Sequence, residues 1–292
     1  MSESVETDVR PAAPDRRVGR TATVADPKNF VGSVAKTFAV LRAFGPDVAE
    51  LTGAEIAARA DLDRGSAFRF AHTLAALGYL APVPGTRKFR LTLKCLELGF
   101  AALSQRELPF HARPLLAEVV PSISDSASFG ALHEGDVVYL ARFEQPGAQP
   151  VTRRPGSRTG AYAAALGHAI LAYLPRDAQI AHLNAVPRVK LSERTLVNLD
   201  ELTARLGEVR ARGFAVSDGE NAYGLRTVAA PVFDAEGAPV AGVSLTIRAE
   251  RTSVQEFVDL AAPHAVRIAG ALTDAARLSL GAITIPPAGG WS

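Results

Sequence analysis

The sequence predicts an α+β protein with two domains, and three observations lead to this fold class. A chain of 292 residues, 48% hydrophobic and 21% charged, is long enough for two globular domains and is not disordered throughout. Residues 33–92 show helical periodicity that is followed by two short strand patterns. From residue 128 onward, strand patterns with hairpin turns alternate with helical patterns, which is typical of an antiparallel sheet with flanking helices.

The composition excludes several classes of protein. The only cysteine is Cys95, which rules out a disulfide framework and a cysteine-rich zinc site. The longest uncharged stretches, 70–86 and 159–175, contain Gly and Pro and fall short of the roughly 20 apolar residues of a membrane-spanning helix. No apolar segment near the start reads as a secretory signal. We expect a soluble, cytoplasmic protein without membrane contact, with a disordered arm over 1–28 and a loose tail over 282–292.

The charge is unevenly distributed, although the net formal charge is only +2. Residues 28–95 carry ten basic and five acidic side chains, a net of +5, whereas residues 107–292 carry 17 basic and 19 acidic ones, a net of −2. A basic front half favours contact with a polyanion there. The alternative is an arginine-rich helix face that is simply solvated.

Three helices are predicted in the front part by the spacing of apolar residues, over 33–44, 52–60 and 64–77. Thr52 and Glu55 can form a capping box at the start of the second helix. Gly78 can end the third helix in a left-handed conformation.

The third helix has one apolar face and one face that suits DNA. Ala67, Phe70, Leu74 and Leu77 fall on one side, and we expect them to pack against the other two helices. The opposite side carries Phe68 beside Arg69 and His72. An exposed phenylalanine beside basic side chains fits a major groove, where arginine binds guanine edges and apolar groups meet thymine methyls.

Two strands are predicted after this helix, over 79–83 and 87–92, with Phe89 and Leu91 on one side of the second strand and Lys88 and Arg90 on the other, as in a half-buried strand. This order of elements is that of a winged helix-turn-helix over 29–92, in which the third helix enters the major groove and the wing meets phosphate or the minor groove. A protein-interaction module is the alternative. The candidate DNA contacts are Thr52, Arg64, Gly65, Ser66, Phe68, Arg69, His72 and Thr73 on the helices, and Arg87 and Lys88 on the wing.

A linker helix is predicted over 93–106, because Leu93, Leu96, Phe100 and Leu103 continue at helical spacing. An apolar seam on such a helix favours a homodimer or a tetramer, and a dimer would place two recognition helices one turn of DNA apart. The alternative is that the seam packs on its own domain.

The rear part, 107–281, is predicted to form an antiparallel sheet with helices around it. The predicted strands are 129–133, 137–143, 214–217, 227–233 and 239–247, and the predicted helices are 167–174, 177–184, 199–212 and 254–278. It contains no phosphate-binding loop, dinucleotide fingerprint, nucleophile elbow or zinc-protease motif, and its histidines are not at ligand spacing. We expect no catalytic residue, no metal and no cofactor.

A ligand pocket is what the rear part favours. The loop 217–224 is polar and bounded by Gly, so it can present backbone N–H groups to a small anion. Ser244 and Thr246 lie two apart on one strand and face the same side, where buried hydroxyls would need a partner. Solvent exposure of these hydroxyls is the alternative. We expect His168 to cap a helix or lie at the surface.

Separated motifs in the same order resemble the IclR family of bacterial transcription regulators. They include SVAKT at 33–37, LTGAEIAARA at 51–60, LDRGSAFRFAHTLAALGY at 62–79, AALGHAILA at 164–172, RGFAVSDGE at 212–220 and GLRTVAAPV at 224–232. The resemblance covers roughly residues 30–280 and implies a GAF-like effector-binding fold for the rear domain. Arg64, Arg69 and Thr73 look most like the branch that senses aromatic acids such as protocatechuate or hydroxybenzoate.

The resemblance also implies which residues contact the effector. The family contacts would fall on Ala165, Leu166, Ser217, Asp218, Leu225, Thr227, Ser244 and Thr246. Ser217 stands where the family often has an acidic group, which favours an anionic ligand held by Arg142, Arg153 or Arg154. Two further departures are Asp63, where proline is frequent, and Gly65, which costs about 1 kcal/mol of helix stability and leaves one base contact in doubt.

The sequence therefore predicts a DNA-binding transcriptional regulator, repressor or activator, that responds to a small organic acid, aromatic if the branch resemblance holds. Its expected partners are a double-stranded operator, the effector and a second copy of the chain. An intracellular enzyme with a DNA-binding domain, and a constitutive DNA-binding protein with a vestigial sensor, are the alternatives.

Overall fold

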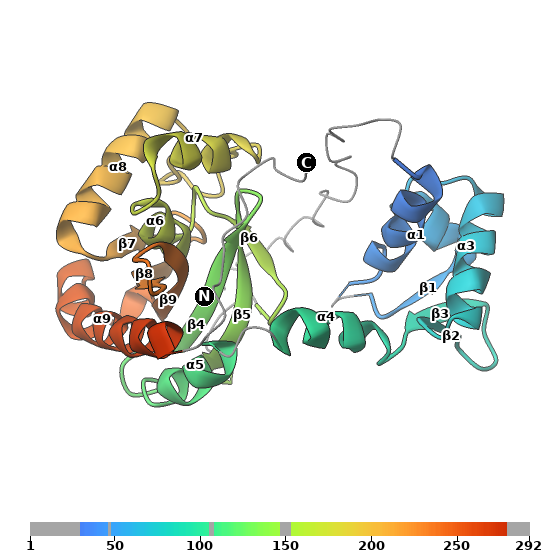
Figure 1. Cartoon of the computed structure of the whole chain (residues 1–292), viewed down its shortest axis with the longest axis horizontal. Coiled ribbons are helices and arrows are strands. Elements are labelled where there is room, and N and C mark those ends of the chain that lie inside the picture. Colours follow the sequence, from blue (N-terminus) through green and yellow to red (C-terminus); the bar gives the residue numbers. More distant parts are fainter. Residues whose placement is uncertain (1–29, 46–47, 105–107, 147–152, 279–292) are drawn as a thin grey trace, which may run out of the picture. The chain divides into compact units, whose positions relative to one another are not determined.

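Figure 1 shows a computed structural model of the chain, which describes residues 30–45, 48–104, 108–146 and 153–278. The chain divides into two compact units, Met1–Ala101 and Ala102–Ser292. Each unit has its own hydrophobic core. The predicted arm over 1–28 and tail over 282–292 lie outside the described residues.

The first unit consists of short helices and a small antiparallel sheet. Its elements are α1 (Gly32–Arg42), β1 (Glu50–Thr52), α2 (Gly53–Arg59), α3 (Arg64–Ala76), β2 (Leu80–Pro82) and β3 (Lys88–Leu91), with the strand order β1-β3-β2. The predicted capping box is confirmed, since the Glu55 backbone N–H donates to Thr52 Oγ1 and the Thr52 N–H donates to Glu55 Oε2. Gly78 adopts a φ of +82°, as predicted for the residue after α3. The unit is a winged helix-turn-helix.

The core of this unit forms where α1, α2 and α3 meet the sheet. Val40, Leu51, Ile56 and Leu74 are fully or almost fully buried in it. The prediction that Leu77 packs in this core is wrong, because its side chain is 54% exposed. Leu77 is the C-terminal cap of α3, so it lies beyond the last turn that the core covers.

A separate helix, α4 (Cys95–Ser104), falls within the predicted linker. Its apolar side chains are solvent-exposed where they are described: Leu96 is 51% exposed and Leu98 is 52% exposed. Leu93, which precedes the helix, is 82% exposed. In the single chain, Leu93 and Leu96 of the predicted seam are therefore not buried, whereas the side chains of Phe100 and Leu103, its other two members, lie outside the described ones.

The second unit is built on one antiparallel sheet with the strand order β6-β5-β4-β9-β8-β7. Its strands are β4 (Ser126–His133), β5 (Asp136–Glu144), β6 (Arg158–Gly160), β7 (Ala215–Asp218), β8 (Leu225–Phe233) and β9 (Pro239–Arg248). Its helices are α5 (Leu108–Ala117), α6 (Ala165–Leu171), α7 (Arg176–Asn184), α8 (Leu199–Arg212) and α9 (Val254–Leu278), with a short 3₁₀ turn at Ala249–Arg251. The predicted α+β class is confirmed, whereas α5, β1 and β6 were not predicted.

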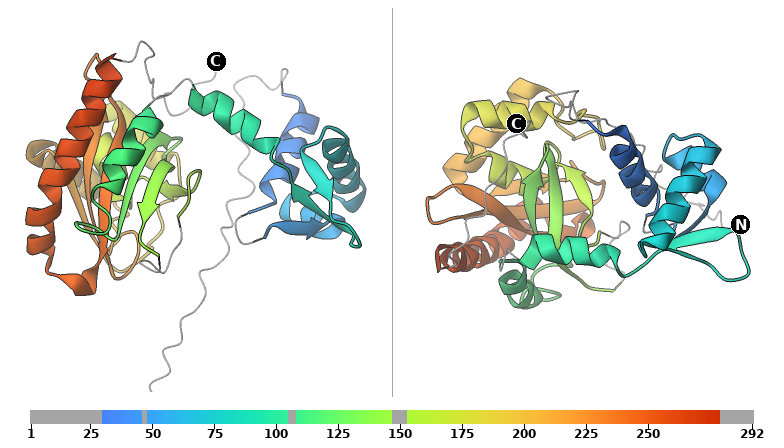
Figure 2. Two further views of the ribbon diagram at one scale, coloured as in Figure 1. Left: turned by 90° about the horizontal axis from the view of Figure 1, so that it is seen from below. Right: turned by 45° about the vertical axis from the view of Figure 1, so that its right-hand side comes forward.

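Helices cover both faces of this sheet (Figures 1 and 2). On one face α5 and α9 pack against Phe129, Val228 and Leu245. On the other face α6 packs against the sheet and against α8. Because side chains alternate along a strand, the neighbours of these apolar residues on β4, β8 and β9 point toward α6. Those neighbours are mainly hydroxyl-bearing, so this face can carry a polar site.

Candidate functional sites: a recognition helix and a ligand pocket

The N-terminus of α3 is fixed by a side-chain cap. Asp63 Oδ1 accepts a hydrogen bond from the Ser66 backbone N–H at 2.8 Å. Hydrogen bonds from the Ser66 side chain and backbone hold the pKa of Asp63 below its ordinary value, so the carboxylate is charged at the positive end of the helix dipole. Asp63 therefore caps the helix at the position where the family frequently has proline.

The outward face of α3 carries an aromatic cluster that reaches the wing. Phe68 is 56% exposed, and its ring centroid lies 4.1 Å from that of His72. His72 in turn makes an edge contact with Phe89 on β3, with centroids 5.5 Å apart. Arg69, between Phe68 and His72 on the same helix, is exposed. These ring contacts join α3 to the wing, while Arg69 is exposed to solvent.

Most of the predicted DNA contacts lie at the surface, with Ser66 as the exception. Arg64, Gly65, Phe68, Arg69, His72, Thr73 and Arg87 are exposed, and Thr52 and Lys88 are half-buried. Ser66 is only 9% exposed, because it lies in the capping turn under Asp63, and it is not placed to reach a base. The Thr73 hydroxyl donates to the Arg69 carbonyl at 2.9 Å, so it is partly engaged within the helix.

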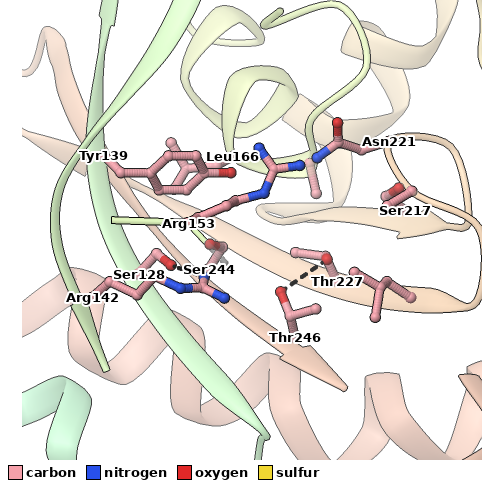
Figure 3. Close-up of a pocket in the computed structure, with 13 residues that line it drawn as sticks. Ser128, Tyr139, Arg142, Arg153, Leu166, Ser217, Asn221, Thr227, Ser244 and Thr246 are labelled. Atoms are coloured by element: carbon pink, nitrogen blue, oxygen red, sulfur yellow. Dashed lines mark hydrogen bonds between the residues drawn. The ribbon is translucent and has the colours of Figure 1, made fainter. Parts of the chain in front are cut away.

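The ligand pocket lies in the second unit between the sheet and the N-terminus of α6 (Figure 3). Its cavity volume is about 30 Å³, within about 460 Å³ of open space that includes the mouth. Strands β4, β5, β8 and β9 supply its floor, and the loop between β7 and β8 closes one side. It is lined by Ser128, Tyr139, Arg142, Arg153, Ala165, Leu166, Ser217, Asn221, Ala222, Leu225, Thr227, Ser244 and Thr246.

Two arginines give the pocket its positive charge. Arg142 is almost buried; its Nε donates to Glu144 Oε2 at 2.9 Å and its Nη1 donates to Ser128 Oγ at 2.8 Å. Arg153 donates to the Thr159 hydroxyl and lies 5.5 Å from the centre of the Tyr139 ring. The charge of Arg142 is therefore balanced by a carboxylate, while these partners of Arg153 are uncharged.

Buried polar groups hold the pocket walls in place. His168 on α6 is fully buried, and its Nε2 lies 2.6 Å from the Tyr162 carbonyl, which fixes Nε2 as the donor. Burial lowers the pKa of His168, although the charge of Glu220 opposes the shift, so the ring is neutral near pH 7. Glu220 Oε1 accepts from Arg205 Nη1 at 2.8 Å. These contacts tie α6 and the 219–224 loop to the body of the unit.

The expectation that His168 caps a helix or lies at the surface is wrong. Its side chain has no exposed area, because α6 is covered by α8 and by the segment that contains Tyr162. Apolar residues on the same helix, such as Leu166 and Ile170, are also buried, and such residues indicate in the sequence that the helix is buried.

The pocket brings together seven of the eight effector contacts that the family resemblance implies: Ala165, Leu166, Ser217, Leu225, Thr227, Ser244 and Thr246. Asp218 lies outside the lining, where Arg226 Nε donates to its Oδ1 at 2.7 Å and Arg194 pairs with its carboxylate. Of the three candidate arginines, Arg154 is exposed and does not line the pocket. Contact of the seven residues with a ligand stays a prediction.

Sequence reasoning missed Ser128 and Tyr139 in the lining, whereas Asn221 and Ala222 belong to the loop 217–224 that was predicted to face the ligand. Ser128 alternates with the buried Phe129 on β4, just as Ser244 alternates with Val243 and Leu245 on β9. The same period-two argument could have found it. Its place beside Ser244 follows from the pairing of β4 with β9, which joins segments about a hundred residues apart and has no local signal.

Neither a metal site nor a membrane-spanning helix is found among the described residues. Within residues 30–45, 48–104, 108–146 and 153–278, no group of three or more His, Cys, Asp or Glu is arranged to hold a metal ion. None of the helices described there combines the length and the hydropathy that crossing a bilayer requires.

Family models match both units of the chain. The model "IclR helix-turn-helix domain" matches residues 33–84, and the model "Bacterial transcriptional regulator IclR C-terminal" matches residues 100–272. These segments contain α3 and the ligand pocket, respectively.

Full-length relatives agree with the family models. The HTH-type transcriptional regulator KdgR of Escherichia coli (strain K12) is 32% identical over 231 residues, 78% of this chain and 88% of that protein. The Pca regulon regulatory protein of Pseudomonas putida is 32% identical over 247 residues, 84% and 83% of the two chains. The crystal structure of a putative transcriptional regulator from Rhodococcus sp. RHA1 superposes with a TM-score of 0.73, at 36% identity over 85% of this chain and 98% of that one. The chain belongs to the IclR family and is a ligand-responsive, DNA-binding transcriptional regulator.

Proposed function

We propose that this regulator reads its operator through α3 and the wing, and that a small organic carboxylate in the ligand pocket changes its affinity for that operator. In the protein, 29–92 would bind DNA, 93–106 would join the two activities and 107–281 would bind the ligand. The single observation that carries the proposal is the make-up of the pocket. It contains Arg153, whose hydrogen-bond partner Thr159 is uncharged, together with the buried Arg142 and several hydroxyls.

The DNA half of the proposal rests on the exposed face of α3. Phe68 is exposed beside Arg69 and His72. Water alone does not favour an exposed phenylalanine, whereas in a major groove the ring can contact thymine methyls and the arginine can bind guanine edges. The proposed contacts are Thr52, Arg64, Gly65, Phe68, Arg69, His72, Thr73, Arg87 and Lys88. Ser66 is left out because the cap buries it.

The test of the DNA half compares two arginine variants. Operator fragments are first selected from random DNA by the protein itself. Arg69→Ala should weaken binding to them by about 1–3 kcal/mol in fluorescence anisotropy, because a bidentate contact to guanine is lost. Arg176→Ala, an exposed arginine on α7, is the matched control and should bind normally. Unchanged affinity of Arg69→Ala would remove the recognition-helix proposal.

The test of the ligand half uses two adjacent arginines. Arg153 lines the pocket and Arg154 does not. If a carboxylate binds at Arg153, then Arg153→Ala should lose the response of operator binding to organic acids, while Arg154→Ala should keep it. Equal responses of the two variants would contradict the assignment.

We further propose that the regulator binds its ligand without converting it. The lining contains serine and threonine hydroxyls, but among the described residues it has no His, Asp or Glu that could act as a general base beside them. Consumption of a bound acid by the purified protein, followed by NMR, would contradict this.

We also propose a dimer as the DNA-binding form. A single winged helix reads half a site, and a second copy one turn of DNA away multiplies the specificity. The exposed leucines before and within α4 support an interface there. A ligand could then act by shifting the populations of two arrangements of the dimer.

A further inference from the structure

The floor of the ligand pocket carries a row of hydroxyls across three adjacent strands. Ser128 on β4 lies opposite Ser244 on β9, and Thr246 on β9 lies opposite Thr227 on β8. All four side chains point to the α6 face, where they line the pocket (Figure 3). Neighbouring strands are about 4.8 Å apart, so the row offers hydroxyls at short intervals over the whole floor.

Only part of this hydroxyl row is bonded within the protein. Thr227 Oγ1 and Thr246 Oγ1 are 3.0 Å apart, and Ser128 Oγ accepts from Arg142. In the part of the chain that the structure describes, the side chains of Ser217, Ser244 and Asn221 make no hydrogen bond. Ser217 and Ser244 are almost buried residues that line the pocket, so a ligand that hydrogen-bonds along the floor would replace the water that such hydroxyls need.

The apolar part of the lining is small. It consists of Ala165, Leu166, Ala222 and Leu225, which are aliphatic. Tyr139 is the one aromatic ring among the lining residues, and Arg153 lies over it. Ligand pockets for apolar molecules are lined mostly by hydrophobic and aromatic side chains, and here polar groups dominate instead.

A polyhydroxylated ligand matches this surface better than a flat aromatic one. An aromatic acid presents polar groups only at the edge of its ring, so its face would cover Ser244 and the remaining donor and acceptor capacity of the other floor hydroxyls without pairing with them. A chain or ring with a hydroxyl on most carbons can pair with them along its whole length. The carboxylate of such a ligand would pair with Arg153, whose partners Thr159 and Tyr139 are uncharged.

We propose that the ligand is a carboxylic acid bearing several hydroxyl groups, of the sugar-acid class, with its carboxylate at Arg153 and its hydroxyls on Ser128, Ser244, Thr246 and Thr227. This inference rests on the proposed function, because it names the class of acid that the same pocket takes. It departs from the aromatic acid that the branch resemblance implies.

The first experiment is a calorimetric titration of the full chain with acids of three classes. The probes are L-threonate, D-gluconate and D-galactonate as sugar acids, 4-hydroxybenzoate as an aromatic acid and hexanoate as an aliphatic acid, with the neutral polyol D-glucitol as a control. At least one sugar acid should bind about tenfold or more tightly than the other two classes, and glucitol should not bind. Tighter binding of 4-hydroxybenzoate or hexanoate would overturn the inference and leave the carboxylate proposal intact.

The second experiment separates the hydroxyl floor from the charge. Ser244→Ala should weaken the tightest sugar acid about tenfold or more, because a hydroxyl of the ligand loses its partner. Ser122→Ala, an exposed serine of the same unit, is the matched control and should bind normally. If Ser244→Ala has no effect while Arg153→Ala abolishes binding, the sugar-acid inference is wrong and the proposed function stands. If no acid binds the wild-type chain, both are wrong.

Discussion

At the scale of single residues, Glu220 connects the ligand pocket to the helices behind it. Its carboxylate is 9% exposed and accepts from Arg205 at 2.8 Å, and its backbone carbonyl accepts from Thr195 Oγ1 at 2.6 Å. The two residues that follow it, Asn221 and Ala222, line the pocket. Glu220 thus sets the position of this part of the wall without touching the pocket itself.

We predict that Glu220→Ala lowers the free energy of unfolding by about 1–3 kcal/mol, because the partly exposed Arg205 loses its buried partner and keeps only the exposed Glu208. The same variant should bind the ligand more weakly, since the 219–224 loop loses the hydrogen bond between the Glu220 carboxylate and Arg205. Urea unfolding measures the first effect and calorimetry the second. Glu236→Ala, an exposed glutamate, is the control. A Glu220→Ala protein as stable as the control would contradict this role.

The residue scale also shows which parts of the pocket the sequence could predict. Ser244 and Thr246 were found from alternation on one strand, and Leu166 from the family motif. Ser128 and Tyr139 were missed because the order of the strands brings them to the same place, and strand order depends on tertiary packing. Asp218 was predicted in the pocket, yet its carboxylate is held by two arginines outside the lining.

At the scale of elements, a charged cap starts the long helix α9. The Ser253 and Thr252 hydroxyls donate to Glu256 Oε2 at 2.7 and 2.6 Å, and the Ser253 N–H donates to the same atom at 2.9 Å. These hydrogen bonds, with that of Thr252 the largest cause, lower the pKa of Glu256 to about 2. The carboxylate is therefore more acidic in the folded chain than in the unfolded one.

We predict that this cap stabilises the fold above about pH 4.5 and fades as the pH falls toward about 2. The sign follows because a group with a lowered folded pKa binds protons more readily in the unfolded state. The difference in unfolding free energy between wild type and Glu256→Gln should be constant at neutral pH and vanish near pH 2. Glu236→Gln should show no such dependence. A difference that does not change between pH 5 and pH 2 would refute the cap.

Two glycines in helices have opposite surroundings, and they give a matched pair. A Cβ at Gly167 on α6 would overlap the backbone of Ala161, whereas a Cβ at Gly207 on α8 would have no neighbour within 4 Å. Close packing of α6 on the 161–164 segment therefore requires glycine at 167. The helix carries Ala165 and Leu166 into the ligand pocket.

We predict that Gly167→Ala destabilises the chain by about 3 kcal/mol and weakens ligand binding, because α6 must move away from Ala161. Gly207→Ala should raise the stability by about 0.5–1 kcal/mol, since alanine is the better helix former and nothing opposes it. Thermal and urea unfolding of both variants measure the contrast. Similar shifts in both would mean that the packing of α6 is not the cause.

The bounds of a helix were predictable where its apolar residues recur at helical spacing over several turns. The predicted bounds of α8 and α9 match the structure, because their apolar stripes run over several turns. The helix α5 was not predicted, because Pro109 stands near its start and proline usually interrupts a helical pattern; in the first turn of a helix, however, proline has no hydrogen bond to lose. The strands β1 and β6 are three residues long and form by pairing with neighbours.

At the scale of the whole molecule, DNA binding and ligand binding belong to separate compact units. The winged helix lies in the first unit, and all the residues that line the ligand pocket lie in the second. A signal between the two activities therefore has to cross from one unit to the other. The exposed leucines at 93, 96 and 98 lie at this junction.

We predict that Leu96→Asp shifts the chain from dimer to monomer in analytical ultracentrifugation and lowers operator affinity. Each Leu96 is 51% exposed, so its burial against a partner would contribute about 1 kcal/mol per copy, and a buried aspartate would oppose association further. Ligand affinity should stay unchanged, because the pocket lies within one chain. Glu97→Gln on the same helix is the control. A wild-type chain that sediments as a monomer on its operator, or a Leu96→Asp chain that stays dimeric, would exclude an interface at α4 and require the two recognition helices to be paired elsewhere.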